Sequence, residues 1–169
     1  MTPIVSVQEL MHDVLQPVAD TLFTSVRIVV DRGGTVEEGP ETDADWENLR
    51  SAAVTLAEGV YLLKVPRPIV PQEDDRVRDA TELTPAQILE KLQRDPVLWD
   101  ARIQTVRNAA LQAIDVIERR DTEELWDVGE NLYIACQNCH YDYWYPAQRE
   151  LLKSLEEKVR QFNLESATP

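Results

Sequence analysis

The stretch DTEELWDVGENLYIACQNCHYDY, residues 121–143, decides the fold that this sequence predicts. Asp121, followed three residues later by Glu124, is typical of the start of a helix. Apolar or sulfur-bearing side chains then recur at helical spacing, at Leu125, Val128, Leu132, Cys136, Cys139 and Tyr143. The stretch therefore predicts a long helix with one buried face, and that face continues into residues 136–140.

Both cysteines of the chain and one of its two histidines lie in Cys136-Gln137-Asn138-Cys139-His140. Cys-x-x-Cys-His is the attachment pattern for c-type haem. The two thiols bond to the vinyl groups of one haem edge, and the adjacent imidazole binds the iron as its proximal ligand. On a helix, positions 136, 139 and 140 lie on one side. We therefore expect one covalently attached haem c, with its iron, per chain.

Three other kinds of site share part of this pattern. A thioredoxin-like dithiol is expected after a strand, at the start of a helix, whereas this motif lies near the end of a predicted helix. A structural zinc site usually has four ligands, and only His12 and acidic residues remain to supply the others. A chance group of core cysteines does not explain why both fall in one pentapeptide. These alternatives stay open beside haem c.

The composition narrows the class of protein. A chain of 169 residues predicts a single domain, residues 1–169, that is large enough for a real core. No run of about 18 apolar residues exists, so no membrane span is expected. The net charge of −14 argues against binding to nucleic acid, which needs a basic face. It suits docking to a redox partner protein with a basic surface, although simple solubility explains it equally well.

A secretory leader is not recognisable at the amino end. Haem c is normally attached outside the bacterial cytoplasm. We therefore expect a periplasmic protein whose leader has been removed, with a mis-assigned start as the alternative.

Three further long helices are predicted from apolar spacing and capping residues. The first spans residues 6–30, with a Ser6/Glu9 capping box, a kink or loosened turn at Pro17, and an end at Gly33-Gly34. The second spans about 42–64 and is stopped by prolines. The third starts at Asp95-Pro96 and runs to about 119, after a short helix opened by Thr84-Pro85.

These helices predict an all-α fold, an antiparallel up-down-up-down four-helix bundle over about residues 6–145. The proline-rich segment 65–83 forms a long connection between helices two and three. An extra amphipathic helix, about residues 146–163, follows Pro146 and is expected to pack on the outside of the bundle or on a partner chain.

The topology brings a second ligand candidate towards the motif. In an up-down-up-down bundle, the start of helix one and the end of helix four share one end of the molecule. Met11 lies near the start of helix one, on its apolar stripe. A thioether is a known axial ligand of haem iron, so Met11 is the candidate distal ligand. Three alternatives remain: Met11 as core filler, His12 as distal ligand, or Leu15 closing off an empty sixth position.

Cations near the same end are candidates for pairing with the haem propionates. These are Lys64, Arg67 and Arg76. The long connection that carries two of them could cover the haem as a lid, and an ordinary solvated loop is the alternative. Aromatic residues that crowd the motif are candidates to pack on the porphyrin: Tyr133, Tyr141, Tyr143, Trp144 and Tyr145.

The motif late in a fourth helix, with Ser6-Val-Gln-Glu-Leu-Met11 at the start of the first, resembles the cytochrome c prime superfamily. The likeness covers roughly residues 6–146 and is greatest to members with a methionine sixth ligand, and to a less characterised group of bacterial monohaem cytochromes. It implies covalent haem at Cys136 and Cys139, His140 as proximal ligand, a periplasmic location, and a homodimer through helices one and two as one arrangement. The chain departs from the family in its longer connection and its extra helix.

We therefore expect a monohaem electron-transfer protein that is not an enzyme. One alternative is a five-coordinate haem protein that binds or senses a small gas such as nitric oxide. A peroxidase-like enzyme would need a distal acid–base group, for which only His12 is on offer. The alternative of another class is a non-haem helical interaction module.

Overall fold

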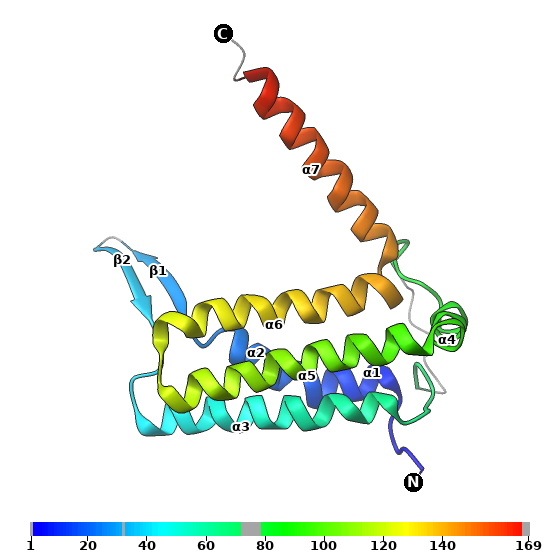
Figure 1. The fold of residues 1–169 in the computed structure, drawn as a ribbon, viewed down its shortest axis with the longest axis horizontal. Helices are drawn as coiled ribbons and strands as arrows, with labels where there is room; N and C mark the ends of the chain where they lie inside the picture. Colours follow the sequence, from blue (N-terminus) through cyan, green and yellow to red (C-terminus); the bar gives the residue numbers. More distant parts are fainter. Residues whose placement is uncertain (1, 32, 72–78, 167–169) are drawn as a thin grey trace.

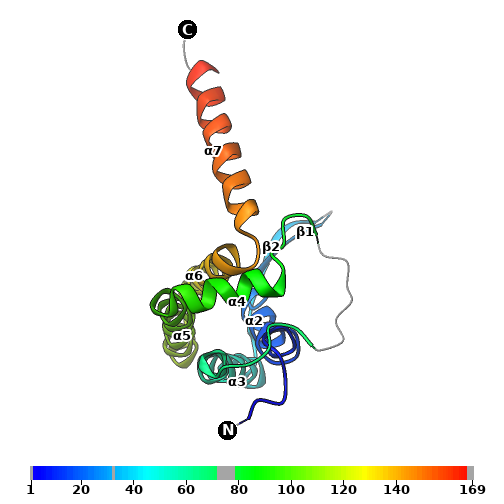
Figure 2. The same cartoon turned by 90° about the vertical axis from the view of Figure 1, so that its right-hand side faces the viewer.

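The computed structural model describes residues 2–31, 33–71 and 79–166. Within this part of the chain the protein is mostly helical, which confirms the predicted helical class (Figure 1). The long helices are α3 (Asp43–Gly59), α5 (Pro96–Arg119), α6 (Thr122–Tyr143) and α7 (Pro146–Ser166). A shorter helix, α4 (Pro85–Arg94), lies across one end of the molecule (Figures 1 and 2).

Helices α3, α5 and α6 and the first helical segment enclose the core. That first segment consists of α1 (Val7–Leu10), η1 (Met11–Leu15) and α2 (Gln16–Phe23). Contacts join α2 to α3, α3 to α5, α5 to α6 and α6 back to α2, so the four segments form a closed ring, seen end-on in Figure 2. Each segment contributes a fully buried side chain to the interior, among them Leu10, Leu56, Ile103 and Leu132.

The helix starts lie where the capping residues predict them. Ser6, Thr42 and Thr84 each form a capping box, in which the cap side chain accepts from the third backbone N–H and the third side chain bonds back. Asp95 and Asp121 accept from the backbone N–H groups of Leu98 and Glu124, at 2.9 and 3.0 Å. These caps satisfy N–H groups that have no partner within the helix.

The first helix ends earlier than predicted. It stops at Phe23 instead of Val30, and the chain then forms an antiparallel hairpin of β1 (Arg27–Asp31) and β2 (Gly34–Glu38), so the purely helical prediction is wrong here. Thr24 and Ser25 donate their hydroxyls to the carbonyls of Asp20 and Leu22, which closes the last turn. The β-branched run that follows favours strand over helix, and Gly34, with φ +127°, serves the hairpin turn.

The predicted loosened turn near Pro17 is confirmed as the π-helical segment η1. Proline has no backbone N–H, and its ring clashes with the carbonyl four residues earlier. The backbone widens instead, and Gln16 N donates to the carbonyl of Met11, five residues back. The wide turn therefore begins at Met11.

The long connection after α3 forms backbone hydrogen bonds with both the first and the last helix of the ring. Helix α3 continues as a 3-10 segment, η2 (Val60–Lys64), so the predicted end near residue 64 is confirmed. Beyond it, Val7 N donates to Pro68 O at 2.8 Å. Near the end of the connection, Leu83 N donates to Trp144 O at 2.9 Å. The connection thus contacts both the start of α1 and the end of α6, while residues 72–78 lie outside the described part.

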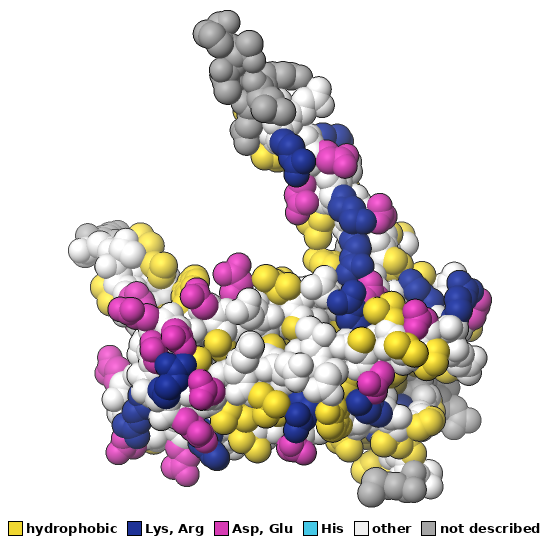
Figure 3. Space-filling model, viewed as in Figure 1, with side chains coloured by type: hydrophobic (Ala, Val, Ile, Leu, Met, Phe, Trp, Pro, Cys, Tyr) yellow, Lys and Arg dark blue, Asp and Glu magenta, His cyan; other side chains and the backbone are white. Residues whose placement is uncertain are grey.

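Helix α7 projects away from the ring (Figures 1 and 3). None of the buried core side chains belongs to it within the described residues, and its apolar side chains are exposed: Leu151, Leu152, Leu155, Val159 and Phe162. The predicted extra helix therefore exists as an arm. Among the described residues, no helix is both long and apolar enough to cross a membrane.

Candidate functional site

A cavity of about 690 Å³ opens between the first helical segment and α6. Its volume falls within the range of about 300–1,000 Å³ found for sites that bind organic ligands. Apolar side chains from the first helical segment, from α3 with η2, and from α5 form its inner wall: Leu15, Ala19, Leu56, Val60, Ile103 and Val106. The cavity is therefore an apolar chamber of cofactor size.

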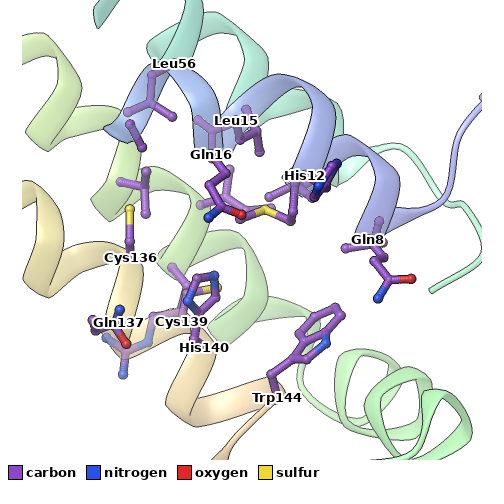
Figure 4. A pocket seen from close by; sticks show the side chains of 18 of the residues that line it. Gln8, His12, Leu15, Gln16, Leu56, Cys136, Gln137, Cys139, His140 and Trp144 are labelled. Carbon is purple, nitrogen blue, oxygen red and sulfur yellow. The ribbon is translucent and has the colours of Figure 1, made fainter. Parts of the chain in front are cut away.

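The three motif residues with metal or thioether chemistry line this cavity from α6. They are Cys136, Cys139 and His140, and Figure 4 shows them along one side of the helix, facing the first helical segment. Positions three and four apart share a helix face, and the buried stripe of α6 runs through Leu132 and Ala135 directly before them. The motif therefore continues the buried face of α6 and faces the cavity.

Met11 lines the same cavity from the opposite wall, at the start of η1. The structure therefore brings Met11 together with the three motif residues, which are separated from it by more than a hundred positions in the sequence. Leu15, the residue that could close an empty sixth position, is buried on the same wall.

His12 has different surroundings from Met11. It reaches the edge of the cavity, but its side chain is 82% exposed, and its Nδ1 lies 2.6 Å from Asp13 Oδ1. The one-residue offset from the apolar stripe turns the ring towards solvent, as the helical period of about 100° per residue predicts. His12 is therefore poorly placed to reach an interior ligand without moving.

Burial changes the acid–base properties of the motif. Desolvation raises the pKa of the Cys136 thiol to about 11, and desolvation with the nearby Cys136 and Asp142 raises that of Cys139 to about 12. Burial also lowers the pKa of His140, so its imidazole is neutral near pH 7. A neutral imidazole is the metal-binding form, whereas redox-active dithiols have lowered thiol pKa values. The pKa directions favour a ligand site over a thioredoxin-like dithiol.

A multi-ligand zinc site finds no support in the described part of the chain. No group of three or more His, Cys, Asp or Glu side chains is arranged there to hold a metal ion. A structural zinc site needs about four such ligands.

The cations predicted for the propionates do not line the cavity. Lys64 pairs with Asp100 at 2.5 Å and lies over the Tyr61 ring. Arg67 donates to the carbonyl oxygens of Leu62 and Val65. Arg76 lies outside the described residues. The structure therefore does not bring Lys64 or Arg67 to the motif.

Sequence reasoning missed Arg102, which lines the cavity from α5. It is the one Lys or Arg among the described lining residues, whereas four carboxylates lie around the same cavity: Glu9, Asp13, Asp20 and Glu82. An anionic group on a bound ligand is therefore attracted towards Arg102 and repelled elsewhere. Its position between Trp99 and Val106 on a helical stripe was the signal available in the sequence.

The aromatic residues near the motif separate into two groups. Tyr133, Trp144 and Tyr145 line the cavity, and Glu82 from the end of the connection joins them. Tyr141 and Tyr143 do not line it. Tyr143 is buried against the edge of Trp99, with ring centroids 4.9 Å apart. Part of the predicted aromatic cluster is thus ordinary core.

No family model, no curated protein and no solved structure matches this chain.

Proposed function

We propose that the protein is a monohaem c-type cytochrome that carries single electrons and is not an enzyme. One observation carries the proposal: one cavity of cofactor size, with an apolar inner wall, is lined by Cys136, Cys139 and His140 on one side and by Met11 on the facing side. Two thiols, an imidazole and a thioether are the donor set of a covalently attached, six-coordinate haem. When bound, the haem supplies an iron centre that exchanges one electron.

The residues of the chain have distinct roles in this proposal. Cys136 and Cys139 hold the haem covalently, His140 binds the iron from the α6 side, and Met11 binds it from η1. A thioether ligand raises the reduction potential of the iron. The apolar inner wall packs against the haem, and Arg102 attracts the propionates in place of the cations predicted from the sequence.

The proposal also covers the topology of the fold, the cellular location and the partners of the protein. We take the ring of helices to be an up-down-up-down four-helix bundle of the cytochrome c prime type, which the closed set of helix contacts supports. The protein then works in the periplasm, and its net charge of −14 suits a redox partner with a basic surface. We also propose a homodimer through the first two helices, an arrangement that the resemblance to the cytochrome c prime superfamily implies.

The test is to express the chain behind a secretory leader together with a c-type haem maturation system. We expect a mass increase of one haem that survives denaturation, and sharp split absorption bands on reduction. The Cys136→Ser/Cys139→Ser variant is the control and should carry no covalent haem. Absence of haem from the wild-type chain under these conditions would end the cytochrome proposal.

A gas-binding haem protein is the second candidate, and the buried Leu15 beside Met11 favours it. In that case Leu15 closes the distal side, and the iron keeps an open sixth position. A five-coordinate spectrum in both oxidation states, with carbon monoxide binding to the reduced form, would support this candidate over electron transfer.

A further inference from the structure

A largely buried carboxylate lies between two guanidinium groups beside the motif. Asp142 is two residues beyond His140, and its side chain is only 13% exposed. Arg102 Nε from α5 lies 2.6 Å from its Oδ2, and Arg149 Nη1 from α7 lies 2.5 Å from its Oδ1. Both carboxylate oxygens are thus used, and three helices meet at this one side chain.

Arg149 also contacts the motif itself. Its Nη2 donates to both the backbone carbonyl and the side-chain oxygen of Asn138, each at 3.2 Å. Asn138 lies between the two cysteines. The guanidinium also lies over the Tyr141 ring, 5.7 Å from its centroid. A planar group with several fixed donors can make these contacts at the same time, and a lysine ammonium cannot.

The charges of this cluster do not cancel. Two guanidiniums face one carboxylate, so the cluster carries one net positive charge in a protein whose net charge is −14. Low exposure of all three side chains weakens solvent screening. One member, Arg102, lines the cavity, so the positive charge lies at the wall of the site.

We propose that Arg149, from the first turn of α7, is a positioning residue of the haem site. It holds the helical turn from Asn138 to Asp142 in place and orients Arg102 through Asp142. It also adds a positive charge that favours the reduced iron. The proposal rests on the function proposed above. It gives α7, which adds nothing to the described core, a role in the site through its first turn.

The geometric part is tested by amide hydrogen exchange on the full chain, with or without haem as purified. In Arg149→Gln we expect the amides of residues 142–145 to exchange about 10 to 100 times faster, because charge-assisted hydrogen bonds are lost. Lys153→Gln is the matched control, since Lys153 is the next basic residue on α7 and its ammonium pairs with Glu150 of the same helix, at 3.1 Å. Equal exchange in Arg149→Gln and wild type overturns the proposal.

The electrostatic part is tested by the reduction potential of the haem-loaded protein. Arg149→Gln removes a positive charge and should lower the potential, while Asp142→Asn removes a negative charge and should raise it. Arg149→Lys keeps the positive charge but lacks the planar set of guanidinium donors. Its reduction potential should therefore stay closer to that of the wild type, while the amides of residues 142–145 exchange faster. If Asp142→Asn does not fold, Arg149→Lys and Arg149→Gln still separate charge from geometry.

The outcomes distinguish this proposal from the proposed function. Shifts of the same sign in Arg149→Gln and Asp142→Asn, or equal potentials in Arg149→Gln and Arg149→Lys, indicate general loosening and overturn the electrostatic role. If the wild-type chain carries no haem after maturation, the cytochrome proposal falls, and the exchange measurement alone decides whether Arg149 positions the turn.

Discussion

Met11 and His12 are neighbours in the sequence, but only Met11 belongs to the apolar wall of the cavity. In the haem-loaded protein, Met11→Ala should convert a six-coordinate spectrum to a five-coordinate or water-ligated one and lower the reduction potential, because the thioether ligand is lost. His12→Ala should leave both properties unchanged. Absorption spectroscopy and a redox titration measure them. An unaltered spectrum in Met11→Ala would show that this methionine is only filler.

Gly59 is the residue that lets η1 approach α3 closely. A Cβ at this position would lie 3.0 Å from Leu15 Cδ2, and Leu15 is buried in the cavity wall. We expect Gly59→Ala to destabilise the fold by about 1 kcal/mol or more, because overpacking outweighs the gain in helix propensity. Urea denaturation at neutral pH measures the change.

Gly129 provides the control for this substitution. Its added Cβ would meet Leu22 O at 3.7 Å, an ordinary contact. Gly129→Ala, in the interior of α6, should therefore stabilise the protein by about 0.5–1 kcal/mol. Equal gains for both substitutions would contradict the close approach at Gly59.

At the scale of the helices, two capping boxes make stability depend on pH. Hydrogen bonds from the side chain and backbone of Ser6 lower the pKa of Glu9, and those from Thr42 lower the pKa of Asp45. A carboxyl with a lowered folded-state pKa adds stability above its unfolded value, here 4.5 for Glu9 and 3.8 for Asp45. This stability is lost as the pH falls from those values through the lower folded-state pKa values.

We therefore expect the urea midpoint to fall on acidification from pH 6 to pH 3, and to fall less in Glu9→Gln/Asp45→Asn. The slope of the urea midpoint with pH is the quantity to compare, since the double variant also changes both caps at neutral pH. Identical slopes in the variant and the wild type would show that the two boxes do not contribute to acid sensitivity.

The helix starts were predictable because local chemistry determines them. Ser6, Thr42 and Asp121 each have a partner three residues on, and the structure uses all three as caps. The hairpin was not predicted, because Val26 and Val30 fit a helical stripe as well as a strand. In the structure the helix stops at Phe23, and the hydroxyls of Thr24 and Ser25 donate to carbonyls of its last turn.

The site was predictable where the chain order alone brings residues together. Met11 and the motif follow from topology, because each lies on the buried stripe of its own helix. The placement of cations did not follow, because Lys64 and Arg67 have long side chains that find partners elsewhere, in Asp100 and in Leu62 O. Arg102 gains its place from a tertiary pair with Asp142, which no local pattern reports.

At the scale of the whole molecule, α7 divides into a docked first turn and a projecting remainder. A chain ending at residue 153 keeps Arg149 and should melt close to the full chain. A chain ending at residue 145 loses Arg149 and leaves Asp142 with one partner. We expect this to cost about 2 kcal/mol, which is a lowering of the melting temperature by roughly 4–8 °C at this size. Equal melting temperatures for the two truncations would contradict a docked first turn.

The two facing walls of the cavity come from segments that lie far apart in the sequence, residues 7–23 and 133–145. During synthesis the first wall emerges early, but its counterpart emerges only after the three intervening helices. Contacts between distant segments also form late in folding, because closing a long loop costs entropy before any contact forms. Before the two walls meet, the thiols of Cys136 and Cys139 are not yet shielded by the packing that raises their pKa values in the folded protein. In the proposed cytochrome, attachment to these cysteines would therefore come first, and the two walls would then close around the attached haem.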